Sequence, residues 1–128
     1  MTTQSKLFAY IKENFGIEPD YPFKEDDVAI FRHRGNRKWF AAAILRLEKK
    51  KLGIAEEGIC NVVNLKCHPI LSGSYRTIPG IFPAYHMNKE HWITVLLDGS
   101  VDADTVWELV NISYNLTVSS SKRKSNPA

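Results

Sequence analysis

The stretch VAIFRHRGNRKWFAAAILRL, residues 28–47, decides the fold of this 128-residue chain. Gly35-Asn36 separates two apolar runs in it, and a pair of this kind between such runs indicates a β-hairpin. The second run is apolar at consecutive positions, which is typical of a strand in the middle of a sheet with both faces covered. The stretch therefore predicts strands at 28–34 and 37–47, joined by a two-residue turn.

Helices at the two ends of the chain are predicted to pack on the sheet that contains this hairpin. In residues 3–14 the apolar side chains follow the spacing of one helical face, a threonine can cap the start, and Gly16 suits the end. Asp102 can cap a last helix that reaches to about Val118, with its apolar residues on one face.

The middle of the chain predicts further strands. We expect a charged hairpin loop at 48–58, a strand at 59–66, a short helical segment at 69–76, and a second hairpin of strands 81–87 and 91–97 around Asn88-Lys89-Glu90. Strands that follow one another by hairpins are antiparallel. The sequence therefore predicts an α+β fold, a two-layer sandwich with an antiparallel sheet of about five strands and the N- and C-terminal helices on one face.

Length and composition fit one domain. The chain has a common single-domain length, and its 44% hydrophobic and 24% charged residues are ordinary for a globular protein. We expect residues 1–118 to form that domain and the Ser-rich, basic residues 119–128 to form a flexible tail. No apolar run approaches the roughly 20 residues that span a bilayer. The expectation is a cytoplasmic, monomeric protein with no membrane partner and with reduced thiols.

Charge is distributed unevenly along the chain. The net charge is only +3, yet residues 31–91 carry eleven Lys and Arg against four Asp and Glu. A basic middle between acidic ends suggests an anionic partner. The alternative is a solvated surface on which the charges cancel in three dimensions.

Four cations surround the first predicted turn: Arg32, Arg34, Arg37 and Lys38. Strand alternation would send Arg32 and Arg34 to one face of the hairpin. A hairpin tipped by cations is a shape that a DNA groove or phosphate backbone receives well. The alternative is a charged, soluble hairpin end that discourages edge pairing.

The second predicted hairpin carries a dense polar and aromatic cluster, residues 85–92. Its candidate DNA-binding residues are His86, Asn88, Lys89 and His91, since these side chains can donate to phosphate or pair with a base edge. The alternative is an ordinary polar turn with Trp92 in the core. A second hypothesis of binding is an apolar surface formed by Trp39, Tyr85 and Trp92, which would take a protein or a small ligand.

Candidate catalytic and metal-binding residues lack the required spacing. The cysteines, Cys60 and Cys67, and the histidines His68, His86 and His91 form no Cys-x-x-Cys or His-Glu-x-x-His pattern. Isolated thiols are usually buried small side chains rather than nucleophiles. We therefore expect no enzyme activity, no metal site and no cofactor.

Several segments together resemble the MmcQ/YjbR family. They are Phe40-Ala41 after a basic turn, residues 64–69 (NLKCHP), residues 83–95 (PAYHMNKEHWITV), residues 97–100 (LDGS) and Ser113-Tyr114. The resemblance runs from about Phe8 to Val118, and residues 86–99 are its most specific part.

The resemblance implies a compact α+β fold similar to the frataxin/CyaY-like arrangement. It also implies two projecting hairpins that have been likened to a double-wing DNA-binding motif. The chain departs from the family at His68, where an Asp commonly precedes the Pro, and in the loop 71–79. The first function hypothesis is accordingly a non-enzymatic module that binds double-stranded DNA through two wings, and the rivals are the protein or small-ligand site above and frataxin-like metal handling.

Overall fold

A computed structural model describes residues 3–23 and 27–118. Three α-helices, one 3-10 helix and five strands follow one another in these residues. In chain order they are α1 (Gln4–Phe15), β1 (Val28–Arg32), β2 (Trp39–Glu48), η1 (Lys49–Leu52), β3 (Ile59–Lys66), α2 (Pro69–Tyr75), β4 (Ile81–Pro83), β5 (Trp92–Leu96) and α3 (Ala103–Thr117). The predicted α+β class with a five-stranded sheet is confirmed.

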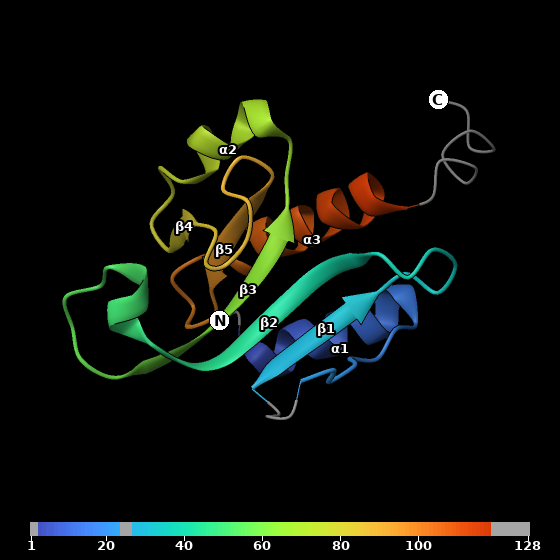
Figure 1. The fold of residues 1–128 in the computed structure, drawn as a ribbon, viewed down its shortest axis with the longest axis horizontal. Helices are drawn as coiled ribbons and strands as arrows, with labels where there is room; N and C mark the ends of the chain where they lie inside the picture. The colour runs from blue at the N-terminus through green and yellow to red at the C-terminus, as the bar shows by residue number, and fades with distance from the viewer. Residues whose placement is uncertain (1–2, 24–26, 119–128) are drawn as a thin grey trace.

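The sheet is antiparallel, with the strand order β1-β2-β3-β5-β4 (Figure 1). Its first three strands follow one another by hairpins, as predicted. After β3 the chain passes through α2 and forms β4 at the far edge, and β5 then returns between β4 and β3. The second neighbour of β3 in the sheet is therefore β5, although α2 and β4 intervene between these two strands in sequence.

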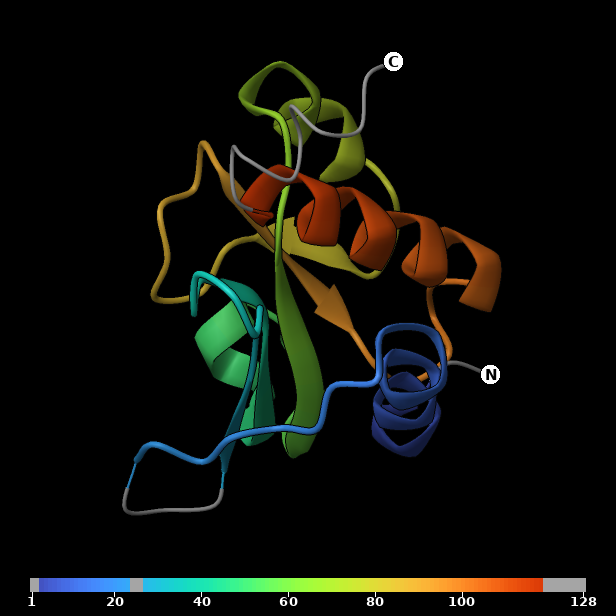
Figure 2. The same ribbon diagram turned by 90° about the vertical axis from the view of Figure 1, so that its right-hand side faces the viewer.

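The helices α1 and α3 both lie on one face of the sheet, as predicted (Figure 2). The buried core between the two layers takes its side chains from α1, α3 and the strands. The helices contribute Leu7, Ile11, Val106 and Val110, and the strands contribute Phe31, Phe40, Ala41, Val63, Leu65, Ile93 and Val95. Burial of such apolar surface contributes roughly 25 cal/mol per Å², so this layer carries most of the stability.

Local capping fixes the ends of both long helices. Thr3 accepts a hydrogen bond from the Lys6 backbone N–H at 3.4 Å, and Gly16 ends α1 in the left-handed region with φ 66°. Asp102 accepts from the Thr105 backbone N–H at 3.2 Å and from its hydroxyl at 2.7 Å, and these bonds hold the pKa of Asp102 below its usual value. These caps are the ones that the sequence predicts.

The opposite face of the sheet, here called the helix-free face, is partly covered by loops. A smaller apolar cluster of Leu47, Cys60, Val62 and Leu96 lies there, with Leu52 of η1 and Tyr85 packed against it. In Figure 2, η1 lies on the side of the sheet away from α1 and α3. This face holds the buried polar residues Asn64 and Thr94.

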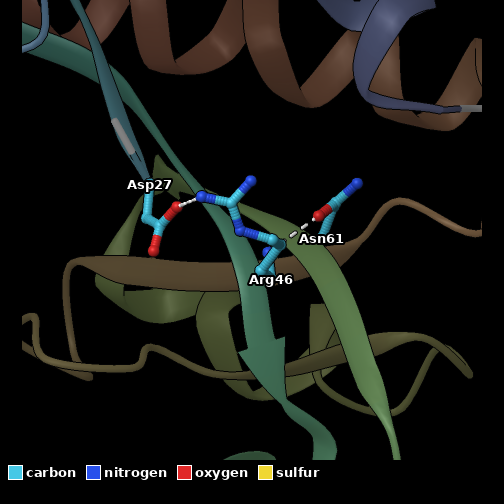
Figure 3. Close-up of polar contacts among 3 residues, drawn as sticks. All are labelled: Asp27, Arg46 and Asn61. Carbon is cyan, nitrogen blue, oxygen red and sulfur yellow. Dashed lines mark hydrogen bonds and ion pairs between the residues drawn. The ribbon is translucent and has the colours of Figure 1, made fainter. Parts of the chain in front are cut away.

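A β-bulge in β2 ties the start of β1 to the sheet (Figure 3). Arg46 adopts φ 57°, its backbone N–H donates to Asn61 Oδ1 at 3.0 Å, and its guanidinium pairs with the Asp27 carboxylate. The Leu45 N–H also donates to the Asp27 carbonyl, at 2.7 Å. Asp27 is therefore a structural partner of the sheet.

Three predicted boundaries are corrected. The first strand ends at Arg32 instead of 34, the second strand begins at Trp39 instead of 37, and the fourth strand ends at Pro83 instead of 87, because these chain segments leave the sheet to form loops. The predicted tail, 119–128, lies outside the described residues. Among the helices in the described part of the chain, none has the length and apolar character needed to span a membrane.

Candidate functional site

The turn between β1 and β2 is longer than the two-residue turn that Gly35-Asn36 predicts. The His33 N–H donates to the Lys38 carbonyl at 2.9 Å, and the Arg37 N–H donates to the His33 carbonyl at 3.1 Å. These bonds enclose a four-residue loop, 34–37. Arg37 adopts φ 64°, a left-handed conformation that is uncommon for a residue other than glycine.

This loop is fastened to the end of α3. His33 is buried, and its Nε2 lies 2.7 Å from the hydroxyl oxygen of Thr117. The Asn36 side-chain amide donates to the Thr117 carbonyl at 2.9 Å, while its Oδ1 accepts from the Lys38 N–H at 2.9 Å. The tip of the hairpin is therefore a fixed part of the domain instead of a free wing.

Two of the four predicted DNA-binding cations at this tip already have partners. Arg32 Nε lies 3.1 Å from Asp20 Oδ2, and its guanidinium carbon lies 5.5 Å from the centre of the Trp39 ring. The guanidinium of Arg34 donates to the backbone carbonyl of Gly16, at the end of α1. In Figure 1 the loop lies beside that end of α1.

Three of these arginines gather in a pocket between the loop and the segment that follows α1. We call it the arginine pocket. It has a volume of about 470 Å³ and is lined by Lys12, Gly16, Ile17, Glu18, Asp20, Arg32, Arg34 and Arg37. The segment is held against β1 because Asp20 and Ile30 exchange two backbone hydrogen bonds of 2.8 Å.

The loop before β5 is closed by the side chain of Asn88. Its Oδ1 accepts from the backbone N–H groups of Glu90 at 2.8 Å and His91 at 3.3 Å, and its carbonyl accepts from the Trp92 N–H at 2.9 Å. Asn88 therefore shapes its own turn. His86 and Lys89 are exposed, whereas His91 is half-buried.

Side chains of the sheet hold the segment that follows β4 over the helix-free face. The Tyr85 N–H donates to Thr94 Oγ1 at 2.9 Å, and the Asn64 side-chain amide donates to the Tyr85 carbonyl at 2.9 Å. The Thr94 hydroxyl in turn donates to Asn64 Oδ1. Both backbone groups of Tyr85 are thus satisfied by two buried side chains, which fixes the position of this segment.

The fixed segment forms one wall of an apolar pocket on the helix-free face. We call it the sheet pocket, and its volume is about 270 Å³. It is lined by Phe23, Val28, Ile30, Trp39, Ala42, Ile44, Asn64, Tyr85, His86 and Met87. Its floor comes from β1, β2 and β3, and its walls come from the residues next to the two predicted wings.

Two of the three residues predicted to form an aromatic surface meet in this pocket. Trp39, at the start of β2, and Tyr85, in the segment after β4, both line it, and the Tyr85 ring lies 4.0 Å from the ring of His86, centre to centre. Trp92 pairs with Lys66 across β5 and β3 and is not among the described residues that line the pocket.

The floor of the sheet pocket and the acids of the arginine pocket are missing from the sequence-based site. One local signal for the floor of the sheet pocket is Asn64, a polar residue between the apolar residues Val63 and Leu65 of β3. Asp20 and Glu18 carry no such signal, because only the folded chain brings them to Arg32 and Lys12.

The two cysteines are buried free thiols. Burial raises the pKa of Cys60, although Lys49 partly offsets the effect, and burial likewise raises the pKa of Cys67. A thiol with a raised pKa is protonated at neutral pH and is a poor nucleophile. In the described residues no group of three or more His, Cys, Asp and Glu side chains could hold a metal ion.

A family model and several known proteins are similar to this chain. The family model described as YjbR matches residues 12–116. The chain is 37% identical to YyaQ of Bacillus subtilis (strain 168), described as an uncharacterised protein, over 91% of this chain and 99% of that protein. It is also 40% identical to YjbR of Escherichia coli (strain K12), over 44% of this chain and 48% of that protein.

Solved structures agree with this result. A crystal structure of a protein from Pseudomonas syringae has a TM-score of 0.87 and 41% identity, covering 90% of this chain and 98% of that one. A crystal structure of a Deinococcus radiodurans protein has a TM-score of 0.72 and 26% identity, covering 98% of this chain and 88% of the other.

Proposed function

This chain belongs to the YjbR family, and we propose that it is a non-enzymatic binding domain whose sheet pocket receives the flat apolar group of a small organic ligand. One observation carries the proposal. Trp39, at the start of β2, and Tyr85, 46 positions later in the segment after β4, line a single apolar pocket on the helix-free face of the sheet. Ligand sites are typically concave and apolar with a few polar groups.

The size of the sheet pocket limits its occupant. A volume of about 270 Å³ is near the lower end for small-molecule sites, so it suits one ring system better than a peptide helix. Tyr85 and Trp39 offer aromatic rings that can stack on a flat group. Asn64 and His86 are the polar lining residues, and they could orient the ligand by hydrogen bonds.

The surroundings of the sheet pocket also favour an apolar ligand. Phe23, at its margin, is 51% exposed, and Trp39, Tyr85 and Met87 are each only partly buried. Exposed apolar side chains that gather around a concavity are typical of a binding site. A ligand in the sheet pocket would cover part of this surface and gain the hydrophobic contribution of its burial.

Filling the sheet pocket tests the proposal. Ala42 is 4% exposed and lies in its floor. We expect indole to bind the wild-type chain with a dissociation constant of roughly millimolar or tighter, and Ala42→Leu to weaken binding at least tenfold, because the added carbons occupy the site. Binding is measured from ¹H–¹⁵N chemical shifts, which should move at Trp39, Tyr85 and Met87.

The matched control is Ala55→Leu, the same substitution at an exposed position in the loop before β3. It should bind indole like the wild type, and both variants should keep a wild-type amide spectrum. Saturating shifts that are equal in Ala42→Leu and Ala55→Leu would place the ligand elsewhere. An absence of saturable shifts with indole and other small aromatic probes would contradict the proposal.

Duplex DNA remains the second candidate partner because of one specific observation. The loop between β1 and β2, although it is fastened to the ends of α1 and α3, lies toward the same left-hand side of the view in Figure 2 as the loop before β5. Lys38 and Lys89 are exposed in these two loops, and among the described residues their side chains have no ion-pair partner. They are the cations best placed to contact phosphates.

A salt series with a short duplex tests this candidate. If the two loops bind phosphates, the double variant Lys38→Ala/Lys89→Ala should lower the slope of log affinity against log salt by roughly 0.9 for each lost contact. The control, Lys6→Ala/Lys50→Ala, removes the same charge from α1 and η1, outside the two loops, and should keep the wild-type slope. Equal slopes for the three proteins, or no binding at low salt, would rule out the two-loop DNA site.

A further inference from the structure

The arginine pocket and the sheet pocket are lined by different residues. The two pockets share no described lining residue, and the arginine pocket is built from the end of α1, the segment after it and the loop 34–37. The arginine pocket is therefore a separate candidate site. Its lining is dominated by charge instead of by apolar side chains.

The charges in the arginine pocket do not cancel. Its lining includes four cationic and two anionic side chains, an excess of two positive charges. Lys12 Nζ lies 3.3 Å from Glu18 Oε1, and Arg32 Nε lies 3.1 Å from Asp20 Oδ2. The excess therefore falls on Arg34 and Arg37, neither of which pairs with a carboxylate among the described residues.

Arg34 keeps free donors although it has a partner. It donates from Nη2 to the Gly16 carbonyl, which is a neutral acceptor at the end of α1. A guanidinium has five N–H donors in a planar fork, so the other edge of Arg34 remains able to bind an anion. The bond to Gly16 fixes the orientation of that edge, because Gly16 itself is held by its N–H donation to Lys12 at 2.9 Å.

Arg37 occupies an unusual backbone conformation next to Arg34. Its φ of 64° lies in the left-handed region, where glycine and asparagine are far more common than arginine. The loop bonds to Lys38 and the bond from Asn36 to Thr117 hold it there. Strained residues held by their surroundings are often found where a ligand is gripped.

We propose that the arginine pocket binds a small molecule through a dianionic phosphate group, with Arg34 and Arg37 as its two ligands. Two guanidinium groups match a dianion in charge, and their forks match the oxygens of a phosphate in geometry. Arg32 and Lys12 line the same pocket and are kept in place by Asp20 and Glu18, which also limit the positive charge offered to larger polyanions.

Titration with inorganic phosphate and with pyrophosphate, against sodium chloride at equal ionic strength, tests this proposal. We expect saturable ¹H–¹⁵N shifts at Gly35 and Arg37 and at the Nε–H of Arg34. Arg37→Asn should weaken binding at least tenfold while keeping the fold, since asparagine adopts the left-handed region readily. Arg37→Lys keeps the charge and loses the planar guanidinium, so its affinity for phosphate should lie between those of the wild type and Arg37→Asn.

The control is Lys6→Ala, which removes an exposed cation of α1 that does not line the pocket and should leave the affinity for phosphate unchanged. Shifts that do not saturate, or equal affinities in Arg37→Asn and Lys6→Ala, would overturn the proposal. A duplex arm separates the two sources of phosphate. If Arg37→Asn weakened duplex binding as much as phosphate binding, the pocket would belong to a nucleic-acid surface and the small-molecule assignment would be wrong.

Discussion

Replacing Phe40 with alanine is expected to lower the free energy of unfolding by roughly 3–5 kcal/mol, the range for large aromatic side chains removed from a core. Phe40 is fully buried near the start of β2. Its ring centre lies 5.9 Å from that of Phe15, 6.3 Å from Phe31, and 5.1 Å from Tyr114. The substitution would therefore remove contacts to α1, β1 and α3 at once.

Removing the Phe40 ring would also weaken the packing that supports the loop 34–37. His33 packs on Phe40 with ring centres 5.2 Å apart, and His33 is one of the two residues that connect this part of the chain to Thr117. A cavity at Phe40 would leave this buried imidazole with less packing on one side. We therefore expect Phe40→Ala to loosen the arginine pocket as well as the core.

Thermal and urea unfolding measure this effect. For a domain of this size, a loss of 3–5 kcal/mol corresponds to a decrease in Tm on the order of 10–20 °C. Phe23→Ala is the matched control, because Phe23 is 51% exposed and its removal should change stability by about 0.5 kcal/mol or less. If Phe40→Ala cost no more than Phe23→Ala, Phe40 would not be the centre of the core.

Features that depend on neighbours in sequence were predictable. The caps at Thr3, Gly16 and Asp102 act within one helical turn, so residue type and spacing suffice to place them. The third strand, Ile59–Lys66, has the predicted bounds because a charged, glycine-containing loop precedes it and a proline, Pro69, follows it closely. The placement of both long helices on one face follows from their apolar stripes.

Features that depend on distant residues were not predictable in the same way. The Gly35-Asn36 pair indicates a two-residue turn, but Asn36 and His33 bond to Thr117, more than 80 positions away, and the loop is longer. Arg32 and Arg34, predicted to lie on one face of the hairpin, likewise have the distant partners Asp20 and Gly16. Sequence patterns near a residue do not report such partners.

The candidate sites show the same division. The aromatic residues Trp39 and Tyr85 were recognisable as unusual, yet their meeting in one pocket depends on the pairing of β3 with β5. That pairing brings Asn64 and Thr94 to adjacent positions on the helix-free face, where they can hold Tyr85. The site is therefore a consequence of strand order, which the two hairpin signals alone do not give.

The polar triangle of Asn64, Thr94 and Tyr85 leads to the second large effect. Asn64 is 1% exposed and Thr94 is fully buried, so neither can exchange its partner for bulk water. Asn64→Leu keeps a similar size while removing both a donor and an acceptor. It would leave the Tyr85 carbonyl without its donor and the Thr94 hydroxyl without its acceptor, at a cost of roughly 1–3 kcal/mol for each buried group.

We expect this substitution to affect the sheet pocket more than the core. The Tyr85 segment would lose the bond that holds its carbonyl, so hydrogen exchange at its amide should become faster, and indole binding should weaken at least tenfold. The amides of β5 residues whose side chains lie in the core, such as Ile93 and Val95, should keep their protection, because their ladder bonds to β3 remain.

A double-mutant cycle with Thr94→Val provides the control. Because the two side chains belong to one hydrogen-bonded unit, the double variant Asn64→Leu/Thr94→Val should be less destabilised than the sum of the single variants. Additive losses would mean that the two residues act independently. Unchanged indole binding in Asn64→Leu would show that the triangle does not shape the sheet pocket, and the ligand-binding role would then have to be assigned to another surface.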